Sequence, residues 1–145
     1  MIFLTIEKHY QQIKKLDYEI DNLLERRKYY YEQVTKITPA YKDINVQESS
    51  RDGSKIDTYV TLMADDLSVI TDLLNERDRL FNDLERTIDC VEDKRMVLLL
   101  KLRYLYNRTW GYIAKRVNVS ESHIKNSYHE KCLKEFKKVS TKSTE

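Results

Sequence analysis

The apolar residues among the first forty positions recur at alternating steps of three and four, which is the spacing of one helix face. They form two rows with a period of seven, Ile6, Ile13, Ile20 and Val34 in one and Leu16, Leu23, Tyr30 and Ile37 in the other. This heptad pattern, with Arg27 as its one charged interruption, predicts a long helix from Thr5 to Ile37. We expect Pro39 to end that helix, because proline disfavours a helical conformation in the residue before it.

A second heptad segment follows a polar, turn-rich stretch, residues 38–55, which we interpret as a loop longer than most ordered connections. Its first row consists of Ile56, Met63, Ile70 and Leu84, with Arg77 as a charged interruption. Its second row consists of Val60, Leu67, Leu74, Phe81 and Ile88. Two helices of matched length joined by one loop predict an antiparallel hairpin, a coiled-coil stem over residues 1–90. The stem is either an intramolecular pair or, as the length of its stripes favours, half of a dimeric four-helix bundle.

Residues 91–138 change to a pattern of three short helices, and residues 139–145 are expected to be a flexible tail. Thr109 and Ser120 are residue types that cap helix N-termini, and Asn118 between them tolerates a positive φ. The three expected helices run from about Glu92 to Tyr106, from Trp110 to Val117, and onward from Ser120. The predicted fold class is therefore all-α, with a helical hairpin stem followed by a three-helix domain.

Small and apolar residues in this domain fit a helix-turn-helix, in which two short helices cross closely. The residues expected at the crossing are Ile113, Ala114, Val117, Val119 and Ile124. One position departs from the motif, because Ser127 stands where an apolar residue is usual. We expect Tyr128 to take over its packing and the third helix to be slightly rotated.

Composition and charge support this interpretation. With 2 Gly, 1 Pro and 34% charged residues, the chain is poor in turn formers, and no glycine pattern forms a phosphate-binding loop. Residues 91–145 hold 13 Lys and Arg against 6 Asp and Glu, a net charge of +7, whereas residues 1–90 have a net charge of −5. A basic C-terminal part on an acidic stem indicates a polyanionic partner at one end of the chain.

The segment RTWGYIAKRVNVSESHIK, between an apolar helix and a basic helix ending in CLKEF, resembles the promoter-binding C-terminal domain of bacterial sigma factors. This resemblance covers Val91 to Phe136. With the upstream helical pair and the ITPAY segment, the whole chain resembles small sigma-like proteins of phages and prophages of Gram-positive bacteria, related to ArpU-type late-gene regulators. The resemblance implies a phage-encoded transcription regulator that binds double-stranded DNA.

The residue types on the third helix suit base recognition. Asn126 can make bidentate bonds to adenine, Lys125 can donate to guanine or phosphate, and Glu121 can accept from cytosine. Together with these three, Ser122 and His129 are expected to face outward, with His123 at the margin. Contacts to the DNA backbone are expected from Arg108, Thr109, Lys115 and Arg116. The alternatives are that this face is only solvated or that it contacts a protein.

The sequence indicates no enzyme, metal site or cofactor. His9, His123 and His129 do not have the spacing of zinc ligands, and Cys90 and Cys132 read as reduced thiols of a cytoplasmic protein, here of a bacterial host. No segment has the length of a membrane span. The leading hypothesis is a sequence-specific DNA-binding regulator whose stem dimerises or touches RNA polymerase. The rival is a phage factor that engages host RNA polymerase or another host protein without reading DNA.

Overall fold

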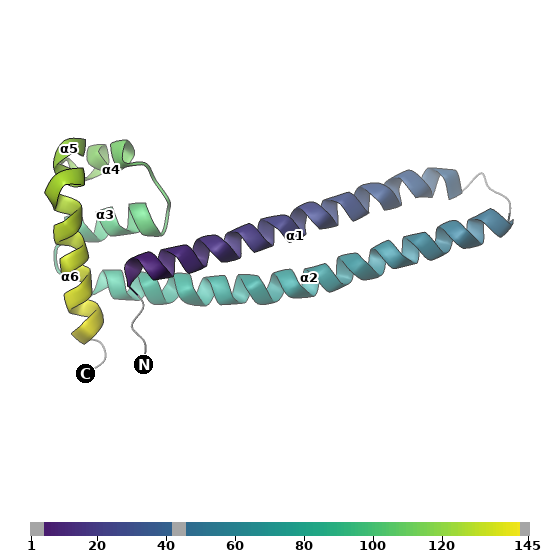
Figure 1. Ribbon diagram of the computed structural model, residues 1–145, viewed down its shortest axis with the longest axis horizontal. Helices are drawn as coiled ribbons and strands as arrows, with labels where there is room; N and C mark the ends of the chain where they lie inside the picture. Colours follow the sequence, from purple (N-terminus) through teal and green to yellow (C-terminus); the bar gives the residue numbers. More distant parts are fainter. Residues whose placement is uncertain (1–4, 42–45, 143–145) are drawn as a thin grey trace. The chain divides into compact units, whose positions relative to one another are not determined.

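The computed structural model describes residues 5–41 and 46–142, and these form helices joined by short turns, with no strand among them (Figure 1). The helices are α1 (Ile6–Tyr41), α2 (Val46–Asp89), α3 (Lys94–Tyr104), α4 (Trp110–Val117), α5 (Glu121–His123) and α6 (His129–Lys142), with a π-helical turn, η1 (Ile124–Tyr128), between the last two. The prediction of an all-helical chain is confirmed for the described residues.

The expected end of the first helix and the expected loop at residues 38–55 are wrong. The helix α1 continues through Pro39 to Tyr41, and α2 already begins at Val46, so only residues 42–45 separate these two helices along the chain. A proline has a helical φ of about −65° and removes only one N–H donor, which costs less near a helix end than in its middle. The polar residues after Val46 form helix because their types are compatible with it, and Gly53 is tolerated inside.

The described residues divide into two compact units, one of which is the helix pair within residues 15–77. The α1 and α2 segments of this unit run side by side in opposite directions (Figure 1), and Tyr30 packs on Tyr59 with ring centroids 5.7 Å apart. Ile20 and Ile70 are buried between them. The row predicted on α1 is therefore the row that packs.

On α2 the second predicted row is displaced by one residue at three of its positions, whereas Phe81 is half-buried and Ile88 fully buried as predicted. Val60, Leu67 and Leu74 are 53%, 48% and 42% exposed, and the preceding positions pack against α1 instead. Those positions include Asp66, and because Asp66 is charged, the hydrophobicity pattern did not indicate this row. Asp66 is 4% exposed and is paired with Arg26, whose Nε–H donates to its carboxylate at 2.8 Å. The ion pair allows a carboxylate at a buried seam position.

The other unit combines the described parts of residues 1–14 and 78–145, a boundary that differs from the predicted one at residue 90. Its core is formed by side chains from the start of α1, the end of α2, and α3, α4, η1 and α6, and it includes Ile6, Leu84, Ile88, Leu99, Leu100, Ile113, Ile124, Cys132 and Phe136. A domain of fewer than fifty residues buries too little apolar surface by itself. The ends of the long helices supply the surface it lacks.

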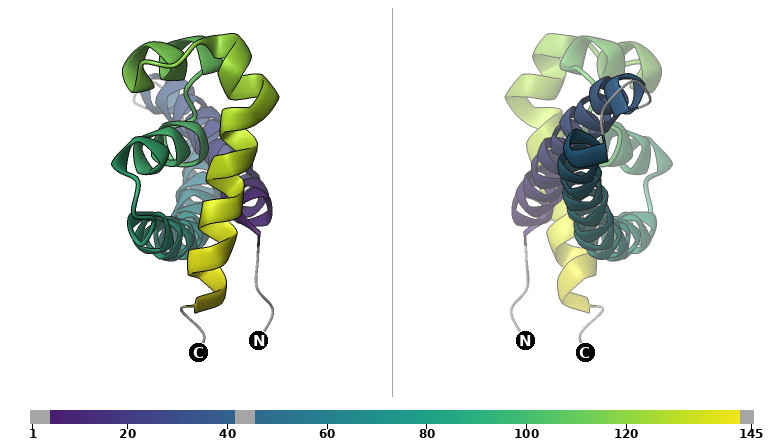
Figure 2. Two further views of the ribbon diagram at one scale, coloured as in Figure 1. Left: turned by 90° about the vertical axis from the view of Figure 1, so that its left-hand side faces the viewer. Right: turned by 90° about the vertical axis from the view of Figure 1, so that its right-hand side faces the viewer.

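The helix α3 packs against two other helices of this unit. The helix α3 contacts both α4 and α6, and Figure 2 shows α6 crossing it from one side. Asp93 caps α3 by accepting the N–H of Arg95 at 2.9 Å, and α3 ends two residues earlier than predicted. Tyr10 of α1 donates to the side-chain oxygen of Asn107 at 2.6 Å and meets the ring of Tyr104 edge-on. This contact holds the turn that leads into α4.

Candidate nucleic-acid interface

The segment from Thr109 to Ser120 has the local geometry predicted from its sequence. The Thr109 hydroxyl accepts the N–H of Tyr112 at 3.2 Å, and α4 begins at Trp110. Asn118 ends α4 in a left-handed conformation, with φ 59° and ψ 45°. The Ser120 hydroxyl then accepts the N–H of His123 at 3.1 Å and starts α5. The two caps and the positive φ are confirmed.

The expected packing behind this turn is also present. Ile113 and Ile124 are fully buried and Val117 is 3% exposed, while Ala114 and Val119 are half-buried. The helix α4 contacts both α5 and η1. Because Ile124 points into the core, residues one or two positions away on the same segment face outward.

Five of the six residues expected on the outer side of this segment are exposed: Glu121, Ser122, His123, Lys125 and Asn126. They pair along the helix at a spacing of four. Lys125 Nζ lies 3.0 Å from the Glu121 carboxylate, and the Asn126 amide donates to Ser122 Oγ at 3.3 Å. His123 Nδ1 lies 3.1 Å from the Ser127 hydroxyl. All three are surface interactions, which a stronger ligand can replace at small cost.

His129, the sixth residue, is not on the outer face. It is half-buried, and its backbone N–H donates to the carbonyl of Ile124, five residues earlier, which is the π-helical pattern. In an α-helix a residue five positions after Ile124 lies roughly 140° around the axis and faces out. The wider π turn brings it back toward the core side. The prediction of an outward His129 is therefore wrong, and the π turn is the reason.

The π turn coincides with the departure from the motif at Ser127. Ser127 is half-buried, and Tyr128 is half-buried with a hydroxyl that has no hydrogen-bond partner among the described residues. Burial raises the pKa of Tyr128 to about 12. Tyr128 thus has the packing role expected of it. The rotation expected from the sequence takes the form of one wide turn.

His129 lies among aromatic side chains. Its Nε2 is 2.7 Å from the Tyr104 hydroxyl, its ring stacks on Tyr104, and Trp110 meets it with ring centroids 4.7 Å apart. Burial, together with the positive charge of Arg103, lowers the pKa of His129, while burial raises the pKa of Tyr104 to about 12. Both side chains are therefore neutral at neutral pH.

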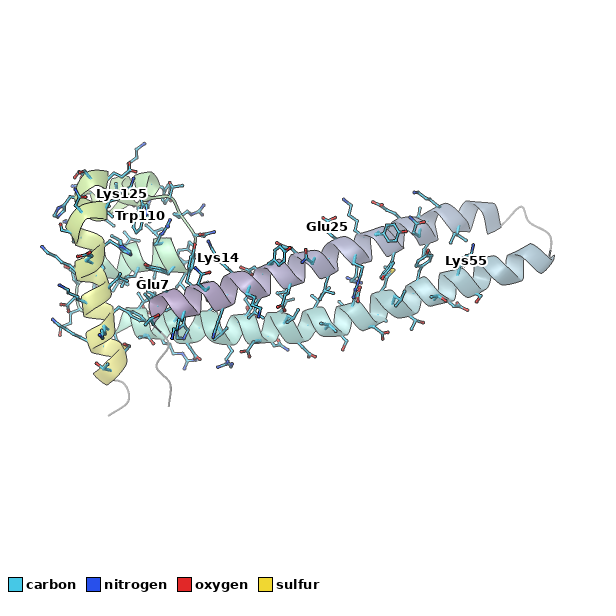
Figure 3. The ribbon with its side chains drawn as sticks, in the orientation of Figure 1. Glu7, Lys14, Glu25, Lys55, Trp110 and Lys125 are labelled. Atoms are coloured by element: carbon cyan, nitrogen blue, oxygen red, sulfur yellow. The ribbon has the colours of Figure 1, made fainter. Side chains whose placement is uncertain are left out.

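The residues expected to meet the DNA backbone are exposed: Arg108, Thr109, Lys115 and Arg116. Arg108 lies over the ring of Tyr112, with 5.5 Å from the guanidinium carbon to the ring centroid. Sequence reasoning missed Arg103, which lies 4.4 Å above Trp110 and donates to the Arg108 carbonyl at 3.3 Å. No local sequence signal identified it, because the contact joins α3 to the start of α4. Trp110 on α4 and Lys125 on η1 are labelled in Figure 3.

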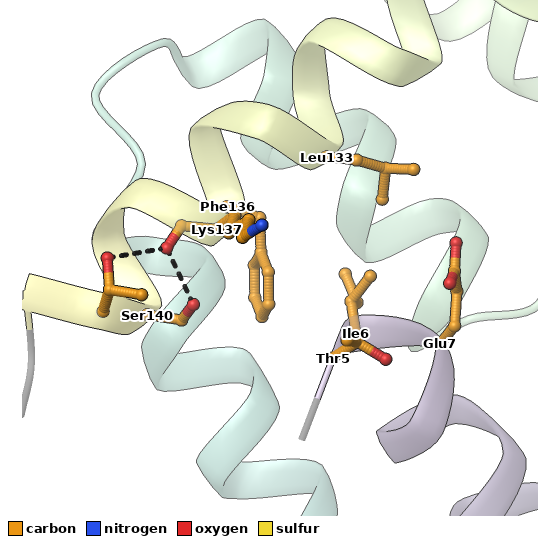
Figure 4. Close-up of a pocket in the computed structure, with 8 residues that line it drawn as sticks. Thr5, Ile6, Glu7, Leu133, Phe136, Lys137 and Ser140 are labelled. Carbon is orange, nitrogen blue, oxygen red and sulfur yellow. Dashed lines mark hydrogen bonds between the residues drawn. The ribbon is translucent and has the colours of Figure 1, made fainter. Parts of the chain in front are cut away.

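A half-open hollow of about 350 Å³ lies between the start of α1 and α6, where Ile6, Leu133 and Phe136 converge (Figure 4).

Burial raises the pKa of the Cys132 thiol to about 12, so it is a packing group at neutral pH. Within residues 5–41 and 46–142, no group of histidine, cysteine and carboxylate side chains could hold a metal ion. In the same ranges no helix is both long and apolar enough to cross a bilayer.

Comparison with known proteins found no matching family model, no matching curated protein and no matching solved structure.

Proposed function

We propose that this chain is a phage-type transcription regulator that binds double-stranded DNA through a sigma-like helix-turn-helix made by α4, the turn at Asn118, and the segment from α5 through η1. The observation that carries the proposal is the capped helix start at Ser120. It presents hydrogen-bonding side chains outward and Ile124 inward, and α4 contacts both α5 and η1, which supports a helix-turn-helix.

In this proposal the exposed face of α5 and η1 enters the major groove. Asn126 and Lys125 are the residues that read bases, because an amide pairs with adenine and an ammonium with guanine acceptors. Each is free to exchange a weak partner on its own helix for a base edge. Glu121 and Ser122, at the helix start, are proposed as further base contacts. His129 is not among the proposed base-contacting residues.

Contacts to phosphate come from the basic residues of α4 and the turn before it. Arg108, Lys115 and Arg116 are exposed, and their charges are independent of the base sequence. The Thr109 hydroxyl accepts the N–H of Tyr112 in the cap, and its own O–H can still donate to a phosphate oxygen. The net charge of +7 over residues 91–145 supports general attraction to DNA.

The proposed role of the stem is self-association. The exposed residues Leu24 and Tyr31 of α1 and Val60, Leu67 and Leu74 of α2 each follow directly after a seam position, so in an antiparallel pair they lie on one side. We call this side the stem face. A shallow hollow lined by Leu24, Tyr31 and Met63 joins the two helices on it. A two-fold axis brings the stem face of one copy onto that of another and completes a four-helix bundle.

A second candidate function rests on the same stem face. Exposed apolar residues in a row mark protein contact sites in general, and host RNA polymerase is the partner that fits a phage transcription factor. In this alternative the chain acts through that protein and does not read DNA.

Selection of bound sequences from random duplex DNA distinguishes the two functions. The first predicts a reproducible motif for the wild-type chain and its weakening in Asn126→Ala. Asn75→Ala, the same change on an exposed site of α2, is the matched control and is expected to select the wild-type motif. If repeated selections enrich no common sequence, the DNA-reading function is wrong and the protein-contact function is favoured.

A further inference from the structure

His129 holds an unusual place in the segment that is proposed to read DNA. Its backbone N–H closes the π turn by bonding to the Ile124 carbonyl, and its side chain points back into a cluster from other helices. A π turn inside an α-helix is rare and is seen often at functional sites. The register of this segment is therefore fixed at His129, three residues after Asn126.

We infer that His129 is a positioning residue: its hydrogen bond to Tyr104 and its packing on Trp110 hold the π turn of η1, and this turn sets the direction of Lys125 and Asn126. The inference deepens the proposed function and rests on it for its effect on DNA. The geometry itself belongs to the free protein and can be tested without DNA.

The cluster links three helices at their ends. Tyr104 is the last residue of α3, Trp110 the first of α4, and His129 the first of α6. Arg103 lies over the Trp110 ring, 4.4 Å from its centroid, and Tyr10 of α1 packs on Tyr104 edge-on. The His129 ring contacts both Tyr104 and Trp110 and shares one hydrogen bond with Tyr104, so it has little rotational freedom. An α-helical register would carry this ring roughly 140° away from these contacts.

The alternative role for His129, direct contact with DNA, does not fit its surroundings. It is half-buried, and its Nε2 is already engaged at 2.7 Å. The charged groups that act on it are Arg103 of α3, Glu7 of α1 and Glu130 of α6, while α4 contributes the uncharged Trp110. Burial and Arg103 favour the neutral ring, which is the form that packs in an apolar cluster.

The test uses the full chain and three substitutions. Tyr104→Phe removes the hydroxyl and keeps the ring, His129→Leu removes the polar partner, and His129→Gln keeps a side chain that can hydrogen-bond to the Tyr104 hydroxyl. Tyr106→Phe is the control, because it makes the same change at an exposed tyrosine of the same region. Circular dichroism establishes that each variant is folded before the comparison.

The first measurement is amide NMR of the free protein. Tyr104→Phe and His129→Leu are expected to shift the amide signals of residues 124–129 and to speed exchange of the His129 amide, while His129→Gln and Tyr106→Phe leave both near wild type. If folded Tyr104→Phe and His129→Leu leave these signals unchanged, the positioning role is wrong, whatever the protein binds.

The second measurement is the ratio of affinities for the selected site and for random duplex DNA. Tyr104→Phe is expected to lower this ratio by roughly three- to tenfold, the factor that corresponds to one lost hydrogen bond. Affinity for random DNA is expected to stay the same in Tyr104→Phe. His129→Gln is expected to keep the wild-type ratio. An unchanged ratio together with shifted amides would overturn the link between the turn and base reading. If the wild type selects no site, the proposed function is wrong. The NMR measurement still tests the positioning role of His129, because it uses the free protein.

Discussion

Asp66 of α2 is buried at a seam position, and Arg26 of α1 binds its carboxylate through both Nε and one terminal nitrogen. The hydrogen bonds from Arg26 lower the pKa of Asp66 and raise that of Arg26. A carboxylate whose pKa is lower in the folded state stabilises the fold above its unfolded pKa. That contribution is lost as the pH falls through the folded value. The helix pair therefore contains an acid-sensitive contact.

The first prediction concerns this pair. Arg26→Met leaves the Asp66 charge buried without its partner, so the urea midpoint at pH 7 is expected to fall and acid unfolding to begin at a higher pH. Arg86→Met is the matched control, because Arg86 is exposed and pairs with Asp83 on its own helix. Urea titrations at several pH values between 7 and 3 measure both effects. Equal midpoints for wild type and Arg26→Met would show that the pair does not stabilise the fold.

The same pair explains where the sequence pattern failed on α2. Two candidate rows one residue apart both have a period of seven, and the pattern favoured Val60, Leu67 and Leu74 because they are apolar. The structure buries the neighbouring row that contains Asp66. Hydrophobicity alone cannot predict a buried carboxylate whose partner is forty residues away in the sequence. The α1 rows were predicted correctly because their packed positions other than Arg27 are all apolar or aromatic, so no competing row was favoured.

Local chemistry was predictable around the candidate interface, and long-range contacts were not. Thr109, Asn118 and Ser120 each act through groups within four residues, so their types indicate their roles. The direction of His129 depends on a π turn that Tyr104 and Trp110 favour from other helices. Ser127 signalled an irregularity at this place, but its residue type did not indicate an inserted turn.

The second prediction concerns the left-handed residue of the turn. Asn118→Ala places a Cβ-bearing residue with no local hydrogen-bonding group at φ 59°, and it is expected to lower the free energy of unfolding by about 1 kcal/mol. Asn118→Gly is expected to be neutral or stabilising, because glycine adopts this conformation readily. Thermal melts followed by circular dichroism measure the difference. Equal melting temperatures for the two variants would contradict the strain argument.

The third prediction tests the stem face. Leu67→Glu puts a charge in the middle of that face, whereas Ser68→Glu adds the same side chain at an exposed neighbouring position. Sedimentation equilibrium at micromolar concentration is expected to give a dimer for wild type and Ser68→Glu and a monomer for Leu67→Glu. A monomeric wild type at these concentrations would mean that the stem face is not a self-association surface.

The fourth prediction separates base reading from phosphate contact. Asn126→Ala and Lys125→Ala are expected to cost about 1–3 kcal/mol each on the selected site and little on random DNA, because their side chains lie on the outer face of η1. Arg108→Ala and Lys115→Ala are expected to weaken both kinds of binding alike. Each is also expected to reduce the slope of log affinity against log salt by roughly one unit.

Titrations of each variant with the selected site and with random DNA, at several salt concentrations, make this comparison. His129→Gln serves as an internal check, since His129 is turned away from the outer face and its conservative variant keeps the bond to Tyr104. If Asn126→Ala and Lys125→Ala leave discrimination intact while binding persists, the segment from α5 through η1 is not the reading surface. Base reading would then have to come from another part of the chain, because phosphate contacts by the basic side chains of α4 carry no sequence information.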